Sequence, residues 1–206
     1  MSLLAHAPRF DTAQAEHFAR TLYRLDAFAS PLPSERDQNF LLRTAAGERY
    51  VLKIANGAED RAMLEAQNAA MAHVADRVTI CPRVLPTIAG ERIGVTPDHR
   101  HLVRLVTFLA GVPLAEIGGP ERAALHQIGL TRAALRADRV RSGVLMENFG
   151  RAVGRLDAAL ADFDHPAAHR DFHWDLAQAA RVIGDHLPRV RDAGDRALVG
   201  QASAAA

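Results

Sequence analysis

The chain has 206 residues, with 25 Lys and Arg against 24 Asp and Glu, which leaves a formal net charge of only +1. This balance excludes the strongly basic surface that nucleic acids or acidic membranes require, so neither is expected as a partner. A single cysteine, Cys81, excludes an internal disulfide framework, and no apolar run approaches a membrane span, which together predict a soluble cytoplasmic protein.

The first part of the chain predicts a helix followed by a hairpin. Thr12 is placed to cap a helix over residues 13–28, and the proline-rich segment 30–34 ends it. Alternating apolar and polar residues then predict two strands, 38–43 and 49–54. The short turn between these strands indicates an antiparallel pair.

A second helix is predicted over residues 59–75, and a second pair of strands over 90–95 and 101–109. Everything beyond residue 121 has helical periodicity. Its two most amphipathic stretches cover 145–163 and 171–186.

Strands with one helix thus give way to helices alone, which predicts an α+β chain with a boundary near residue 112. We expect a first domain over residues 1–111 and a helical domain over 112–200. The tail, 201–206, carries no folding signal and is expected to be disordered.

Lys53 lies near the end of the second predicted strand. Because side chains alternate along a strand, Val51 and Lys53 face one side of it. Tyr50, Leu52 and Ile54 face the other side. Lys53 therefore shares a face with an apolar residue, as the wall of a cleft requires. The alternative is a lysine on the solvent side of an edge hairpin.

Glu65 follows Lys53 by twelve residues, in an alanine-rich helix. A strand lysine with a helical glutamate is the pair that holds ATP in protein-kinase-like enzymes: the lysine neutralises the α- and β-phosphates and the glutamate holds the lysine. Ala69 and Ala72 beside Glu65 would let a strand approach closely, which predicts an ion pair with Lys53. The alternative partner is Arg61, one helical turn back.

The tripeptide His169-Arg170-Asp171 matches the catalytic loop of protein kinases in its letters only. The kinase pattern has an asparagine five residues after the aspartate, and this chain has Leu176 there. Helical periodicity from Phe172 onward also predicts a helix start instead of a loop. We therefore predict no catalytic residue and no metal ligand in this tripeptide.

Several stretches together resemble the aminoglycoside phosphotransferase family, and within it the hydroxylysine-kinase-like branch. The resemblance implies a protein-kinase-like N-lobe, a small antiparallel sheet plus a helix, followed by the first helices of an incomplete C-lobe. The matching stretches are 32–42, 50–54, 64–68, 101–114, 154–160 and 164–179.

The resemblance also implies ATP as the nucleotide and a hydroxylated amine or amino acid as the small-molecule substrate. Magnesium would be needed only in a complete family member. The implied nucleotide-binding positions are Lys53 with Glu65, the phosphate-covering loop positions Ser34, Arg36 and Asn39, and the backbone of Thr107, Phe108 and Leu109.

The family's catalytic loop, H-[GN]-D-x-x-x-x-N, and its metal-binding aspartate have no counterpart in this sequence. We therefore expect the ATP-binding portion of a phosphotransferase, present as a fragment, an early-terminated product or a piece of a fusion, and inactive by itself. The alternative is a catalytically inactive kinase-like binding module. Bare apolar positions on the late helices, namely Leu156, Leu160 and Phe163, would favour a homo-oligomer.

Overall fold

The computed structural model describes residues 6–111, 132–170 and 175–204. The chain forms two compact units, Met1–Asp164 and His165–Ala206. The boundary predicted near residue 112 lies at the start of the undescribed residues 112–131, so it stays a prediction. Among the helices described, none is both long and apolar enough to cross a bilayer.

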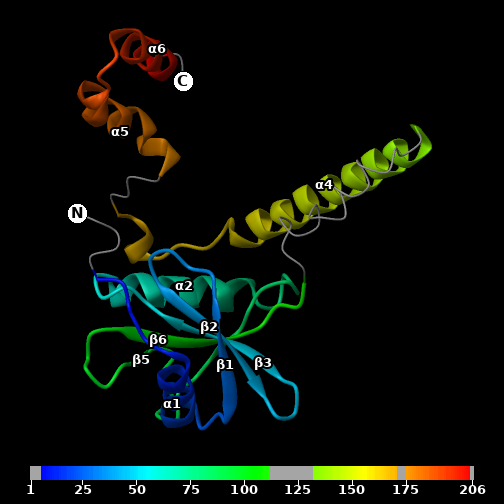
Figure 1. The fold of residues 1–206 in the computed structure, drawn as a ribbon, viewed down its shortest axis with the longest axis vertical. Helices are drawn as coiled ribbons and strands as arrows, with labels where there is room; N and C mark the ends of the chain where they lie inside the picture. Colours follow the sequence, from blue (N-terminus) through cyan, green and yellow to red (C-terminus); the bar gives the residue numbers. More distant parts are fainter. Residues whose placement is uncertain (1–5, 112–131, 171–174, 205–206) are drawn as a thin grey trace. The chain divides into compact units, whose positions relative to one another are not determined.

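One six-stranded antiparallel sheet organises the first unit (Figure 1). Its strand order is β1-β2-β3-β6-β4, and β5 also pairs with β6. The strands are β1 (Ala27–Leu32), β2 (Gln38–Thr44), β3 (Arg49–Ile54), β4 (Val84–Leu85), β5 (Gly94–Val95) and β6 (Leu102–Thr107).

The first helix, α1, spans Thr12–Tyr23 and is shorter than predicted. Its N-cap is Asp11 instead of Thr12, because the Asp11 side chain accepts from the Gln14 N–H at 2.8 Å while the Gln14 side chain accepts from the Asp11 N–H at 2.9 Å. Arg24 ends the helix in the left-handed conformation, with φ 51°. The residues that follow form β1 instead of the helical continuation to residue 28.

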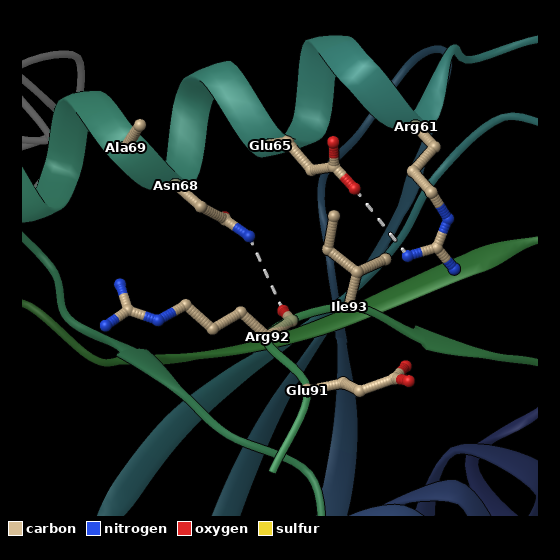
Figure 2. A pocket seen from close by; sticks show the side chains of 7 residues that line it. All are labelled: Arg61, Glu65, Asn68, Ala69, Glu91, Arg92 and Ile93. Carbon is tan, nitrogen blue, oxygen red and sulfur yellow. Dashed lines mark hydrogen bonds and ion pairs between the residues drawn. The ribbon is translucent and has the colours of Figure 1, made fainter. Parts of the chain in front are cut away.

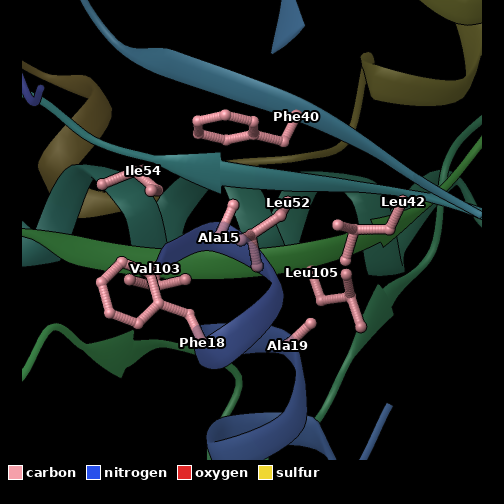
Figure 3. Packing of buried hydrophobic residues seen from close by; sticks show 9 residues of the cluster. All are labelled: Ala15, Phe18, Ala19, Phe40, Leu42, Leu52, Ile54, Val103 and Leu105. Carbon is pink, nitrogen blue, oxygen red and sulfur yellow. The ribbon is translucent and has the colours of Figure 1, made fainter. Parts of the chain in front are cut away.

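The apolar core lies between α1 and one face of the sheet (Figure 3). Leu52 and Ile54 of β3 are fully buried in it, whereas Val51 and Lys53 line a pocket on the other face. The predicted alternation along β3 is therefore confirmed. The cluster consists of Ala15, Phe18, Ala19, Phe40, Leu42, Leu52, Ile54, Val103 and Leu105.

The second helix, α2 (Arg61–Val74), lies on the face of the sheet opposite α1 and agrees closely with the helix predicted over 59–75. Asp60 is its N-cap and accepts from the Ala62 N–H at 2.9 Å. Leu64 fixes the N-terminal half of α2 by packing with Ala55 and Ile93.

The C-terminal half of α2 contacts the long helix α4 (Arg132–Leu160). Asp162, just after α4, accepts two hydrogen bonds from the Arg77 guanidinium, at 2.6 and 3.1 Å, and lies 2.8 Å from His73 Nε2. These hydrogen bonds hold the pKa of Asp162 well below its usual range.

The predicted oligomer through the late helices is not supported. Leu160 packs on the cluster of Val74 and Val78, and the Phe163 ring lies 5.3 Å from the His73 ring. Only Leu156 of the three predicted positions stays exposed, at 37%. Leu160 and Phe163 are therefore covered within the chain, whereas other apolar side chains of α4 stay exposed together with Leu156, namely Val144, Leu145, Met146, Phe149 and Val153.

In its described residues, 165–170 and 175–204, the second unit has helices and no strand. They are the 3₁₀ turns η1 (Pro166–Ala168), η2 (Leu176–Gln178) and η3 (Leu187–Arg189), and the α-helices α5 (Ala179–His186) and α6 (Ala193–Ala204). Asp175 caps η2 by accepting from the Ala177 N–H at 3.0 Å. Residues 201–204 belong to α6, which corrects the expectation of a disordered tail from residue 201 onward. Asp171 lies outside the described residues, so its predicted lack of a metal role stays a prediction.

Replacing Leu52 by alanine tests which face of β3 carries the stability. We expect a loss of about 2–5 kcal/mol in the free energy of unfolding, because the side chain is fully buried in the α1 core. Val51→Ala on the opposite face should cost clearly less. Urea denaturation measures both, and an equal cost for the two variants would contradict the assignment of the core.

Candidate functional site

A pocket of about 590 Å³ opens between the sheet and α2, on the side away from α1. Its size and its mostly apolar walls are typical of a small-molecule site. The lining residues are Val51, Lys53, Gln67, Ala70, Met71, Pro82, Arg104, Val106, Thr107, Phe108 and Leu109.

A row of three polar residues crosses the sheet beneath this pocket. Asn39 of β2 is the register partner of Lys53 of β3, and Lys53 is the partner of Arg104 of β6. Side chains of directly paired residues lie on the same face, so all three project toward α2. Lys53 Nζ donates to Asn39 Oδ1 at 3.0 Å.

The pKa of Lys53 lies below its ordinary value. Burial is the main cause, because it disfavours the charged amine, and the positive charge of Arg104 adds to the effect. Asp37 acts in the opposite direction but does not cancel the shift. Lys53 is thus a cation held at some electrostatic cost, which an anion in the pocket would relieve.

Arg104 is buried to 5% exposure and is held by two side-chain amides of α2. Its Nη1 donates to Asn68 Oδ1 at 2.9 Å and its Nη2 donates to Gln67 Oε1 at 2.7 Å. Burial lowers the pKa of Arg104, which the more distant charges of Asp37 and Glu59 partly offset. These bonds fix the distance between α2 and the central strands.

Glu65 is not part of this pocket, which corrects the predicted ion pair with Lys53. It lines a separate hollow of about 480 Å³, where it points toward Arg61 (Figure 2). The two head groups are 4.0 Å apart, and no ion pair joins Glu65 to Lys53 in the part of the chain that the structure describes. The alternative partner given by the sequence is therefore the observed one.

The predicted ion pair between Lys53 and Glu65 does not form because of the way α2 is rotated about its axis. Positions 65 and 67 point about 200° apart on a helix of 3.6 residues per turn. Packing turns Gln67, Ala70 and Met71 toward Lys53, which leaves Glu65 on another flank. The sequence signal for this rotation was Arg104, a charged residue inside the apolar strand 102–107 that needs polar partners on the covering helix.

The loop before β2 is attached to the protein around it. Arg36 Nη2 lies 2.6 Å from Glu59 Oε2, and Asp37 Oδ1 accepts from the Asn56 N–H at 3.0 Å. Of the predicted loop positions, the structure brings Asn39 to Lys53 but leaves Ser34 and Arg36 outside the pocket lining. A role for the last two in covering phosphates stays a prediction.

Thr107, Phe108 and Leu109 all line the pocket, and their predicted contact with a nucleotide stays a prediction. The Thr107 N–H already donates to the Arg83 carbonyl at 2.9 Å, and the Phe108 N–H to the Arg49 carbonyl at 3.3 Å. Among the described residues, the Leu109 N–H has no such acceptor. Leu109 is therefore the backbone donor that this segment offers to a ligand.

Metal ligands are not gathered in the described ranges: no group of three or more His, Cys, Asp or Glu residues that could hold an ion occurs there. What the pocket presents instead is positive charge from two side chains, mostly apolar walls and one backbone donor. Such a set suits a ligand with an aromatic part and an anionic part.

Most of this chain is similar in sequence to known proteins. A family model described as "Phosphotransferase enzyme family" (APH) matches residues 29–204. Hydroxylysine kinase of Danio rerio is 27% identical over 81% of this chain and 43% of that protein. Hydroxylysine kinase of Mus musculus is 28% identical over 94% of this chain and 51% of that protein. The chain thus spans about half the length of these relatives.

Two solved structures share the fold. A structure described as "Amicoumacin kinase hAmiN in complex with AMP-PNP, Ca2+ and Ami" superposes with a TM-score of 0.56 at 14% identity, over 90% of this chain and 49% of that one. A microcompartment-associated aminopropanol kinase gives 0.54 at 17% identity, over 82% and 46%. These likenesses confirm the predicted kinase-like α+β fold.

Asn68→Ala should show that the amides of α2, and not Glu65, join this helix to the sheet. The variant leaves an N–H of buried Arg104 without its acceptor, so we expect a loss of about 1–3 kcal/mol in the free energy of unfolding. Glu65→Ala removes a side chain that is 53% exposed. It should change the free energy of unfolding by about 0.5 kcal/mol or less. Chemical denaturation compares the two; a larger loss for Glu65→Ala would restore the predicted partner.

Proposed function

Because the chain belongs to the phosphotransferase enzyme family, we propose that it is the ATP-binding part of a small-molecule kinase similar to the hydroxylysine kinases. The observation that carries the proposal is the placement of Lys53 and the 107–109 segment in one pocket. A lysine at one end and a strand-end backbone at the other match the two ends of a nucleotide.

The adenine would lie between the apolar side chains of the pocket, for example Val51 on the sheet and Met71 on α2. The Leu109 N–H would donate to a ring nitrogen. Lys53, oriented by its hydrogen bond to Asn39, would neutralise part of the phosphate charge. This arrangement accounts for the lysine's burial, since a bound anion favours its charged form.

The acceptor substrate is proposed to be a hydroxylated amine or amino acid, because the relatives are named hydroxylysine kinases. Phosphoryl transfer depends on positioning and on charge neutralisation, much of it by magnesium. The printed sequence has no H-[GN]-D-x-x-x-x-N motif to orient a hydroxyl and hold the metal. We therefore propose that this chain binds ATP without transferring its phosphate, and the same absence favours the second candidate, an inactive kinase-like binding module.

Calorimetric titration with ATP tests the binding proposal. Lys53→Ala should raise the dissociation constant for ATP roughly ten- to hundredfold, the worth of one charge-assisted hydrogen bond. Glu65→Gln serves as the control on the other flank of α2 and should leave the constant unchanged. Wild-type protein that does not bind ATP, or that binds it equally well without Lys53, would rule out the proposed site.

A phosphotransfer assay tests the proposed lack of catalysis. The purified chain is incubated with magnesium-ATP and a panel of hydroxylated amines that includes hydroxylysine, and we expect no turnover above background. Turnover that disappears in Lys53→Ala would show that the chain contains a catalytic base and metal site after all.

The pH dependence of binding should report the lowered pKa of Lys53. The charged amine is the form that attracts phosphate, so affinity should be full below this pKa and fall as the pH rises through it. The fall should begin at a lower pH than an ordinary lysine would give. Lys53→Arg, which keeps its charge, should move the fall to higher pH; an unchanged profile would exclude Lys53 as the titrating group.

A further inference from the structure

Arg104 lines the pocket together with Lys53, but it has no part in the nucleotide contacts proposed above. It is the register partner of Lys53, and both side chains line the same cavity. Like charges placed directly opposite each other on a sheet destabilise it, and burial increases the cost. Lowered pKa values of both side chains agree with that cost.

No carboxylate neutralises this arginine by direct contact among the described residues. Asp37 and Glu59 influence it only through space. Asp37 accepts a hydrogen bond from the Asn56 N–H, and Glu59 is ion-paired with Arg36. Two cationic side chains, Arg104 and Lys53, therefore share one wall of the pocket without a carboxylate in direct contact with Arg104.

The groups that hold Arg104 are uncharged. Gln67 and Asn68 each accept one of its N–H groups through a side-chain amide oxygen. An amide fixes the direction of the guanidinium but does not cancel its charge, whereas a carboxylate would do both. In the described residues, no further hydrogen bond to protein uses the remaining N–H groups of Arg104, so they can meet a ligand in the pocket.

We propose that Arg104 and Lys53 form a two-cation subsite for the polyphosphate of the nucleotide, and that Gln67 keeps this subsite positive by holding Arg104 without neutralising it. The inference rests on the proposed nucleotide site and adds a second phosphate-binding residue to it. Arginine is suited to the task because its planar donors match the oxygens of a phosphate.

A two-cation subsite makes the affinity for a nucleotide depend on its number of phosphates. Each added phosphate brings negative charge to the two cations, so affinity should rise from adenosine through AMP and ADP to ATP. The dependence should weaken as salt is added, since salt screens charges that water can reach. Adenosine, which has no phosphate, should bind with an affinity independent of both cations.

Gln67→Glu is the decisive variant, because it keeps the size and the hydrogen bond of the side chain and adds one negative charge. We expect the affinity for ATP to fall about tenfold, with a smaller fall for ADP and none for adenosine. The melting temperature of the ligand-free protein should rise, because Arg104 gains an ionic partner. Stability and ATP affinity should thus change in opposite directions.

Ala72→Glu is the matched control. It adds the same charge to α2, but residue 72 lines a different hollow together with Arg83 and Arg92. The affinity for ATP should stay within about twofold of wild type if the charge acts locally. An equal loss of ATP affinity in Ala72→Glu and Gln67→Glu would indicate a general charge effect and overturn the proposal.

Substitution of Arg104 gives the second measurement. Arg104→Met should remove most of the preference for ATP over adenosine, and Arg104→Lys, which keeps the charge, should restore part of it. If Arg104 only connects α2 to the sheet, Gln67→Glu would strengthen that connection and leave ATP affinity unchanged or improved, which would overturn the proposal.

Different results would rule out the proposed nucleotide site and the two-cation subsite. Wild-type protein without measurable ATP binding would remove the proposed function together with this subsite. Wild-type protein whose ATP binding depends on Lys53 but is indifferent to Gln67→Glu and Arg104→Met would remove the subsite alone.

Discussion

The pairing of β3 with β6 is the constraint on which the rest of the site depends. Its register places Leu52 opposite Leu105, and Lys53 opposite Arg104. One face of this strand pair is therefore fully apolar at its centre, while the other is doubly charged. The apolar face packs against α1 and supplies burial; the charged face can exist because α2 covers it with amides and leaves a pocket in between.

The position of α2 follows from this arrangement. Leu64 fixes its first half in a small apolar cluster, and Val74 fixes its second half against the end of α4. Between these two contacts the helix presents Gln67 and Asn68 to Arg104. The hydrogen bonds to Arg104 determine the rotation of α2 at the pocket, and that rotation decides which of its residues can reach a ligand.

Much of this fold could be predicted from the sequence, because its main strands alternate regularly. The faces of β3 and the extent of α2 follow from local patterns of two and 3.6 residues. The two-residue strand β4 could not be predicted, since it has no periodicity and exists through its pairing with β6. The strand β5 is the end of the strand predicted over 90–95, and it pairs with β6 as expected. The end of α1 was missed because Arg24, which adopts the left-handed conformation there, is not a residue type that signals it.

The partner of Lys53 could not be predicted for a different reason. Spacing along the chain places Glu65 on a helix near Lys53, but helical periodicity alone does not fix the rotation of that helix against the sheet. Tertiary contacts decide it: they turn Gln67 of α2 toward Arg104, and Lys53 donates to Asn39 of β2 instead of to a residue of α2. The relevant clue was in the strand, where Arg104 interrupts an apolar run and must be satisfied by a residue of the covering element.

Stability and the proposed binding site are thus divided between the two faces of one sheet. The α1 face is packed from fully buried apolar side chains and gains free energy on folding. The α2 face keeps two like charges in register, an arrangement that a protein selected for stability alone would replace by an ion pair or by apolar residues. The fold tolerates this electrostatic cost because the apolar core lies on the opposite face of the sheet and shares no side chain with the pocket. A ligand with the opposite charge would return that cost on binding, so the electrostatic cost of two neighbouring cations would become affinity for an anion.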